Sequence, residues 1–564
     1  MKSTNHKIIS TTKNRLQIAL LTATLLSGFY TSQSQNLPAI LTDAELKEEI
    51  YLPDYSYAGY HFSEEQIPVS TSGTVINVTD FGVVADDGLD DSQALLKAMK
   101  MANETEGKVV LQFPKGRIIL SEILYISRSN ICLRGAGSGE QGTTLYYPRP
   151  MRYLANPPEL QELREYLVEL DKRQREPENN LDLPFSQYAW SGGMIWVRVP
   201  GERVKSYLDK YDTKPKVLAQ LLSGQRGRQL IEVQSASKLA VGDVVQIEWY
   251  NKDGKKGSLI SSIYDDADLK VGSHHYNYPN HALVMQQVLI TEIKGNQVTI
   301  KDPLLHDINP QWKPVMTEWK HLEEVGIEHF NIEFPMAPNI AHHVEDGYNA
   351  IYLTNMYNGW VQDIKIKNAD SGILTEQSAN VTIADIETSG DKTAHYAVSM
   401  GSVHNILVRN LSVRNIVTHP LSFNTHATKS VYQNCVVYQV PVLDQHSGAN
   451  HQNLFDNIRV YATSLEDGSY PLFAGGGAGY WKPSHGAFTT FWNIDVQFGN
   501  GLDATKPVIL NGMKDGPAAR LVGIHANRPI TIHYEPNAYI SDENVNLWLV
   551  PSLFDYQLRE RLKR

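Results

Sequence analysis

The feature of this chain that most constrains its fold is a recurrence of short strand-like segments through its second half. The first segment of each unit begins about 21 to 30 residues after the previous one, and most units have no room for a helix. Such a period is typical of a parallel β-solenoid, in which each coil stacks on its neighbour. A β-sandwich is the alternative, but it predicts tight hairpins and no fixed period. The opening segments lie at 350–353, 372–374, 397–400, 421–423, 442–444 and 472–474.

Asparagines lie beside these apolar segments, at Asn405, Asn410, Asn434 and Asn453. Turns between stacked coils need left-handed backbone angles, which Asn tolerates, and an Asn amide can also bond the next coil. We therefore expect most of these residues to be structural.

The N-terminus has the pattern of a cleavable signal peptide. Basic residues, Lys13 and Arg15 among them, precede an apolar run at 16–30, and small residues follow. A membrane anchor is the alternative, but a run of about 15 residues is shorter than the roughly 20 that a spanning helix needs. The sequence thus predicts a secreted or periplasmic protein. Its predicted parts are a signal peptide at 1–34, an N-terminal extension at 35–74, a cap with the first coils at 75–150, an insertion with helices and a small β-rich part at 151–320, the main coils with the site at 321–540, and a C-terminal tail at 541–564.

The net charge and the cysteine content limit the kinds of ligand and metal site that this protein can have. The chain has 51 Lys and Arg against 62 Asp and Glu, a net charge of −11. This balance excludes a general basic surface for nucleic acid or an anionic membrane, so any polyanion must meet a local cluster of cations. Cys132 and Cys435 are too few for a disulfide framework or a cysteine zinc site, and we expect two buried thiols. We also expect a monomer.

Residues 78–95 resemble the opening motif of the pectate lyase-like superfamily. They read VTDFGVVADDG at 78–88 and DDSQAL at 90–95. The resemblance implies an all-β, right-handed parallel β-helix that covers about 75–500 with insertions and is capped by a helix at its N-terminal end. The superfamily contains polysaccharide lyases, polygalacturonase-type hydrolases, epimerases, esterases and phage tailspikes, so this fold leaves the chemistry open.

The acidic cluster in this motif has two interpretations. Asp86, Asp87, Asp90 and Asp91 could bind calcium, but the Gly and Glu positions of an EF-hand loop are missing. Capping of a helix that begins near Ser92 is favoured, because exposed amides at a helix start attract acidic groups.

A hydrolase of this superfamily would need a carboxylic acid and a carboxylate base from neighbouring coils. Residues 368–373 and 394–402 resemble polygalacturonase motifs in part. The Asp-Asp pair expected between them is absent, because the chain reads Gly-Asp-Lys-Thr at 390–393. The hydrolase therefore stays an alternative, with Asp370, Asp391 and Asp444 as its carboxylates.

Histidines are concentrated in the coils, beside Tyr and Lys residues. Nine of the 19 histidines lie at 342–485, and equivalent positions of stacked coils line one groove. Histidine suits a base near neutral pH, and tyrosine can protonate a leaving oxygen. The sequence predicts that Tyr396, His426 and His446 share one carbohydrate-facing ledge. The predicted catalytic residues are His395, Tyr396, His426, His446 and Lys392.

Two polar stretches, 443–456 and 473–486, are predicted to contact substrate. The second combines a glycine loop with Trp481 for stacking on a sugar and Lys482 for an anionic group. The predicted substrate-binding residues are Tyr348, Glu376, Asn424, Asn450, His451, Trp481, Lys482 and His485.

A metal site is not predicted. His342 and His343 are adjacent and would point to opposite faces of a strand, and no His-Glu-x-x-His pair is present. We expect no cofactor, although a divalent cation such as calcium stays open.

These residues together predict a carbon–oxygen lyase. Removal of the C5 proton of a uronic acid and loss of its C4 oxygen need a base, an acid and a group that stabilises the carboxylate. The expected partner is an anionic polysaccharide, algal and sulfated polymers included, or its oligosaccharides. Both a chain-cleaving lyase and a terminal dehydratase fit this chemistry. A solenoid that binds carbohydrate without catalysis is the third possibility.

Overall fold

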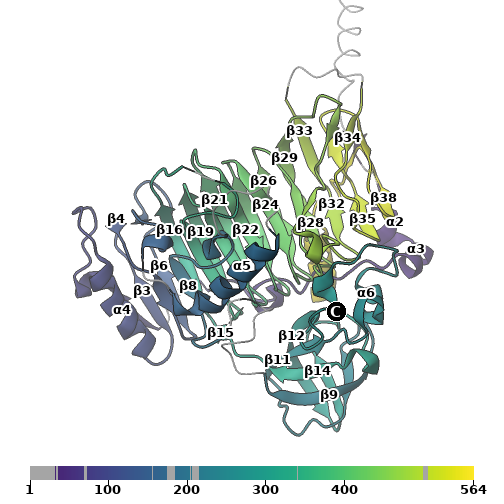
Figure 1. Ribbon diagram of the computed structural model, residues 1–564, viewed down its shortest axis with the longest axis horizontal. Coiled ribbons are helices and arrows are strands. Elements are labelled where there is room, and N and C mark those ends of the chain that lie inside the picture. Colours follow the sequence, from purple (N-terminus) through teal and green to yellow (C-terminus); the bar gives the residue numbers. More distant parts are fainter. Residues whose placement is uncertain are drawn as a thin grey trace, which may run out of the picture.

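The computed structural model describes residues 32–33, 36–68, 73–154, 157–174, 185–202, 205, 215–338, 341–499 and 506–564. They form a right-handed parallel β-helix with a smaller β-barrel beside it (Figure 1). The predicted all-β solenoid is therefore confirmed. The predicted signal peptide lies outside the described residues except for 32–33, and a bilayer-spanning helix is not found among the residues described.

One parallel sheet of eight strands runs along the β-helix and carries the site. Each strand comes from a different coil, so Val398 lies between Ile373 and Leu421 of the neighbouring coils. These aliphatic side chains belong to one apolar core that continues from coil to coil. In order the strands are β31 (Gly475–Gly476), β27 (Leu443–His446), β24 (Val417–Asn424), β22 (Ala394–Met400), β20 (Ser371–Glu376), β17 (Asn349–Thr354), β8 (Ile195–Val197) and β5 (Leu124–Ile126).

The other faces of the coils are two long parallel ladders, which join through four bent strands. These are β16 (Gly326–Glu333), β19 (Trp360–Lys367), β21 (Thr382–Ser389) and β23 (Leu407–Val413). Each has one residue with a left-handed φ at the bend, where Asn410 Nδ2 donates to Asp385 Oδ1 at 2.8 Å. The remaining strands of these ladders are β2 (Thr74–Asn77), β3 (Val109–Gln112), β4 (Gly116–Ile119), β6 (Ile131–Arg134), β7 (Thr143–Tyr146), β25 (Val431–Gln433), β26 (Val436–Val437), β28 (Leu454–Asp456), β29 (Arg459–Ala462), β32 (Thr490–Trp492), β33 (Asp495–Phe498), β35 (Ala519–Val522), β36 (His525–Ala526) and β38 (Ala538–Ser541).

The predicted left-handed asparagines are confirmed at Asn405, Asn410 and Asn434, whose φ angles lie between 54° and 56°. Asn453 differs, because the preceding Gln452 takes the left-handed angle at that turn, with φ 53°. The Asn453 amide still bonds the neighbouring coil, since its Nδ2 donates to the Ala427 carbonyl at 2.9 Å.

Helix α4 (Ser92–Glu104) covers the N-terminal end of the solenoid, with Leu95 and Met99 buried in the core (Figure 1). Asp90 Oδ1 accepts from the Ser92 amide at 2.8 Å, while Asp91 Oδ1 accepts from the Val84 amide at 2.9 Å. The acidic cluster therefore bonds backbone amides around the helix start, although the side chain of Asp91, the N-cap residue, does not bond the helix itself.

The insertion contains a closed antiparallel barrel with its own apolar core. The chain also returns to the solenoid once inside the predicted insertion, because β8 pairs with β5 and β17. Three fully buried residues, Ile195, Trp196 and Val197, account for that return. The barrel strands are β9 (Val217–Gly224), β10 (Leu230–Val233), β11 (Val244–Trp249), β12 (Val284–Lys294), β13 (Gln297–Ile300) and β14 (Val315–Glu318), and the helices are α5 (Gln161–Gln174) and α6 (Ser258–Ile263).

Both ends of the described chain pack on the outside of the coils. Ile40 and Leu41 join Leu553 and Phe554 in an apolar cluster with Leu454 of the β-helix. The predicted tail at 541–564 is thus docked, and Cys132 and Cys435 are buried free thiols as predicted. The elements not yet named are α2 (Ala39–Thr42), α3 (Ala44–Glu49), α7 (Leu553–Leu562), β1 (Ser32–Gln33), β15 (Leu322–Glu323), β18 (Met356–Tyr357), β30 (Ser469–Tyr470), β34 (Val508–Leu510), β37 (Ile530–Ile532) and β39 (Val545–Asn546).

Candidate active site

A cavity of about 460 Å³ lies over the C-terminal part of the eight-stranded sheet. The ends of β20, β24, β27 and β31 form one wall, and aromatic side chains that include Trp190 and Trp481 form much of the other. The described residues that line it are Tyr166, Phe185, Trp190, Lys205, His342, His343, Leu374, Thr375, Glu376, Tyr396, Ser399, Gly401, Ser402, His419, Asn424, Thr425, His446, Ser447, Gly476, Gly477, Ala478, Tyr480 and Trp481.

Asp444 lies buried between two histidines at the cavity wall. Its Oδ2 is 3.2 Å from His419 Nδ1 and 3.4 Å from His446 Nδ1, and it accepts from Ser422 Oγ at 2.6 Å. Burial alone would raise the pKa of Asp444, but the two imidazoles hold it below its usual value. A carboxylate at Nδ1 favours the tautomer with a proton on that nitrogen, which leaves Nε2 of both rings as an acceptor.

The Tyr396 phenol lies beside these rings. Its ring centroid is 5.1 Å from that of His419 and 6.5 Å from that of His446, and its Oη accepts from Asn424 Nδ2 at 3.2 Å. Burial raises the pKa of Tyr396, so the phenol keeps its proton, and burial lowers the pKa of His446, so that ring is neutral at pH 7. The site thus combines a proton donor with a proton acceptor.

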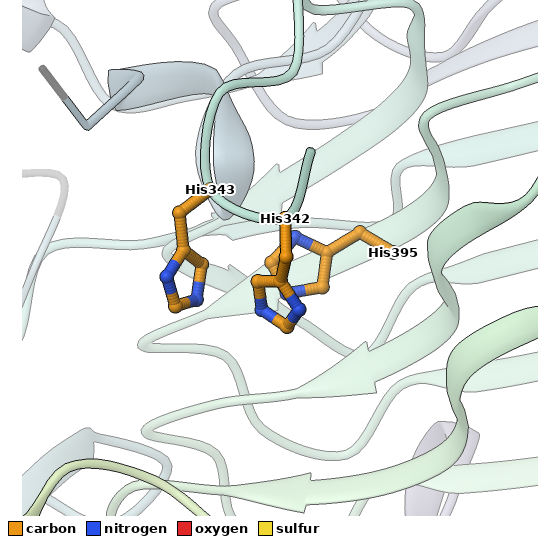
Figure 2. A group of neighbouring side chains, drawn as sticks. All are labelled: His342, His343 and His395. Carbon is orange, nitrogen blue, oxygen red and sulfur yellow. The ribbon is translucent and has the colours of Figure 1, made fainter. Parts of the chain in front are cut away.

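Three more histidines lie against this group (Figure 2). The rings of His342 and His343 are 3.8 Å apart, and the ring of His395, from β22, is 4.4 Å from that of His342. The expectation that adjacency sends His342 and His343 to opposite faces is wrong, because they lie in a turn before β17 and not in a strand. Burial lowers the pKa of His342 to about 4, and it also lowers those of His343 and His395.

Glu376, predicted to bind substrate, lines the cavity at the end of β20. Its Oε2 is 2.8 Å from Nζ of Lys205, which also donates to the Trp190 carbonyl at 3.0 Å. Among the described residues that line the cavity, Lys205 is the one lysine or arginine, and it comes from a segment of the insertion.

Lys392 and Tyr348 lie outside the cavity lining. Lys392 forms a buried ion pair with Asp370, whose other oxygen accepts from the amides of Gly347 and Tyr348 at 2.9 and 2.8 Å. The Lys392 ammonium also lies 4.9 Å from the Tyr348 ring centroid. These contacts fix the backbone between His343 and β17. Lys392 therefore acts on the site through the position of this loop and not through the cavity lining.

The predicted ledge holds Tyr396 and His446 but not His426. His426 has a left-handed φ of 63° in the turn after β24, and that turn directs its ring to a separate cavity of about 20 Å³. There its ring lies 5.6 Å from that of Trp481, beside His275 of the insertion.

Four other predicted contacts lie outside the cavity lining, three of them buried and Lys482 half-buried. His451 contacts His306 of the barrel region, with 2.7 Å between the Nε2 atoms, and His485 Nε2 is 2.8 Å from Tyr534 Oη. Asn450 Nδ2 donates to the carbonyls of Ser447 and Ser484. The Lys482 ammonium is held by Ser484 and by the carbonyls of Gly475 and Gly476 at 3.4 and 3.2 Å.

Several cavity residues were not among those predicted from sequence. His419 belongs to the histidine-rich stretch, and its register beside Tyr396 places it in the site. Phe185, Trp190 and Lys205 come from the insertion, where no repeat marks a side chain as facing the coils.

The opening coils match the model of one known family. Residues 75–146 match the family described as Rhamnogalacturonase A/epimerase, pectate lyase-like. No match was found among curated proteins.

Solved structures with similar coils include the tailspike protein gp49 from Pseudomonas phage LKA1, at 11% identity and a TM-score of 0.46, covering 84% of this chain and 81% of that one. An exopolygalacturonase from Thermotoga maritima, at 10% identity and a TM-score of 0.30, covers 85% and 93%. At these values the likeness says nothing about chemistry. The opening coils match the pectate lyase-like family, and the chain has the right-handed parallel β-helix of that superfamily.

Proposed function

We propose that this protein is a secreted carbon–oxygen lyase that acts on a uronic acid in an anionic polysaccharide or its oligosaccharides. The observation that carries the proposal is the position of Asp444 between His419 and His446, beneath a cavity that also contains the Tyr396 phenol. The family match of the opening coils is compatible with a carbohydrate substrate.

The chemistry needs one base and one acid on the same sugar. In the proposed reaction Nε2 of His419 or His446 takes the C5 proton, and the C5–H electron pair becomes the C4=C5 double bond. The C4–O bond breaks, and the leaving oxygen takes the Tyr396 proton. The product is an unsaturated uronate, and the imidazolium returns the proton to tyrosine through solvent.

The substrate class follows from the cavity lining. Trp190 and Trp481 offer faces on which a sugar ring can stack. Lys205 offers a positive charge for the sugar carboxylate, which gains electron density as the C5 proton leaves. Because Lys205 already pairs with Glu376, substrate binding requires exchange or sharing of that partner.

The hydrolase alternative is less well supported. Asp370 pairs with Lys392, Asp444 lies between two histidines, and Asp391 is exposed outside the cavity lining. An acid and base pair flanking one glycosidic bond needs two carboxyl groups that face the same space.

The test is incubation of the mature protein with algal, pectic and animal uronate polymers and their oligomers. A lyase or dehydratase produces absorbance at roughly 235 nm from the new double bond. New reducing ends without this absorbance would select the hydrolase, and binding without either product would select the non-catalytic solenoid. The matched control is His533→Ala, which changes an exposed histidine that does not line the cavity.

A further inference from the structure

The three histidines in Figure 2 have more ligating nitrogens than hydrogen-bond partners. One nitrogen from each of His342, His343 and His395 can be chosen so that all three atoms lie within 4.8 Å of one another. Neither ring nitrogen of the deeply buried His395 has a hydrogen-bond partner among the described residues. Buried polar atoms are nearly always satisfied, so an unpartnered one in a cluster of ligands indicates a missing water or ion.

We propose that His342, His343 and His395 bind one divalent transition-metal ion, with zinc the best fit. Imidazole nitrogens are ligands for zinc, copper, nickel and iron, whereas calcium takes oxygen ligands. Three protein ligands leave a fourth position, and two of the three ligands line the cavity. This ion would replace the calcium that the sequence left open.

The spacing of the rings suits this role. Two nitrogens on a tetrahedral zinc lie roughly 3.4 Å apart. Ring rotations that move the nitrogens by about an ångström would bring the three atoms to that spacing.

Glu345 supplies the support that metal-bound histidines usually have. Its Oε1 lies 3.0 Å from Nδ1 of His395, an ion-pair contact without hydrogen-bond geometry, and accepts from the backbone amide of His343 at 3.2 Å. A carboxylate at Nδ1 turns Nε2 of the same ring toward a metal. Glu345 is therefore assigned as a positioning residue for the ion.

The neighbouring group of His419, Asp444 and His446 also gathers three ligands. There the carboxylate oxygen already lies within 3.4 Å of both Nδ1 atoms and accepts from Ser422, so Asp444 is satisfied without an ion, although His419 Nε2 and His446 Nδ1 have no hydrogen-bond partner among the described residues.

The experiment is calorimetric titration of zinc chloride into the mature protein, without further truncation, after metals have been removed with a chelator. The expected result is one tight site per chain, together with a cobalt(II) visible spectrum typical of a site with nitrogen ligands. The variants His342→Ala and His343→Ala should lose this site. Because both substitutions alter a turn, thermal unfolding is measured to check that the variants are folded. Glu345→Gln should weaken binding about 10- to 100-fold.

The control is His533→Ala, which should bind like the wild type. Equal zinc binding by the wild type and His343→Ala, or no tight binding at all, would overturn the proposal. The metal titration contains no sugar, so its outcome is independent of the proposed lyase. Zinc binding without elimination would refute only the lyase, and elimination by metal-free protein that binds no zinc would refute only the metal site.

Discussion

Nε2 of His306, in the insertion, lies 2.7 Å from Nε2 of His451 on the β-helix. Ser262 Oγ lies 3.0 Å from the other nitrogen of His306, and the Ala449 carbonyl lies 2.9 Å from that of His451. If His451 donates to Ala449, its Nε2 accepts from His306, whose Nδ1 then accepts from Ser262. This series of hydrogen bonds is complete when both rings are neutral. A proton added to Nε2 of His451 would place its N–H group against the N–H group of His306.

We expect acid to destabilise the protein through such rings. Burial lowers the pKa values of His451 and His275 from 6.5 to about 4. In this range the unfolded chain binds protons that the folded chain does not, so stability is complete above pH 6.5 and falls as the pH approaches 4. Between these two pKa values, each such histidine lowers the free energy of unfolding by up to about 1.4 kcal/mol for each unit that the pH falls.

Denaturant unfolding at pH 7.5, 6.0 and 5.0 measures this slope. His451→Gln should reduce it, and His533→Ala, at an exposed position, should leave it unchanged. A free energy of unfolding that stays constant from pH 7.5 to 5.0 would contradict the prediction.

Asp444→Asn should reduce kcat for elimination by about 10²- to 10⁴-fold, because the amide no longer holds both histidines in the acceptor tautomer. His419→Ala should cause a loss in the same range if His419 is the base. Initial rates of absorbance increase provide the measurement. Asp391→Asn, which alters an exposed carboxylate, is the matched control, and equal losses in the two Asp→Asn variants would show that Asp444 has no special role.

Tyr396→Phe should reduce the rate at least about 100-fold, since the leaving oxygen loses its proton donor. The defect should shrink on a substrate whose C4 substituent is a better leaving group, such as an aryl ether, because that group departs without a proton. A structural role for the phenol would give the same loss on both substrates. Circular dichroism checks that the variant is folded.

Lys392→Met should destabilise the protein by about 3–5 kcal/mol, because it leaves the buried Asp370 carboxylate without its partner. Removing both charges in Lys392→Met/Asp370→Leu should recover part of that loss. The measurement is thermal unfolding together with the specific activity of the folded fraction. Full stability with no activity would instead support the catalytic role predicted from sequence.

The repeat was readable from sequence because every coil must bury the same apolar positions. That requirement produced the period that begins at 350–353 and placed Tyr396 and His446 along one sheet. His419 could have been found in the same way, because parallel register sets it beside Tyr396. Neighbouring coils thus place residues of equal register side by side, although the adjacent residues His395 and Tyr396 show that alternation alone did not decide every face.

Residues outside the strands were decided by the tertiary structure. His426 differs from His446 because it lies in a turn with a left-handed φ, and the direction of a turn side chain follows no alternation. Lys392 was predicted to be catalytic because its partner Asp370, 22 residues away along the chain and on another coil, could not be identified from the sequence. The far wall of the cavity depends on how the insertion folds back over the coils, which no local pattern encodes. Sequence thus determined the scaffold and one wall of the site, and long-range packing determined which side chains face each other across it.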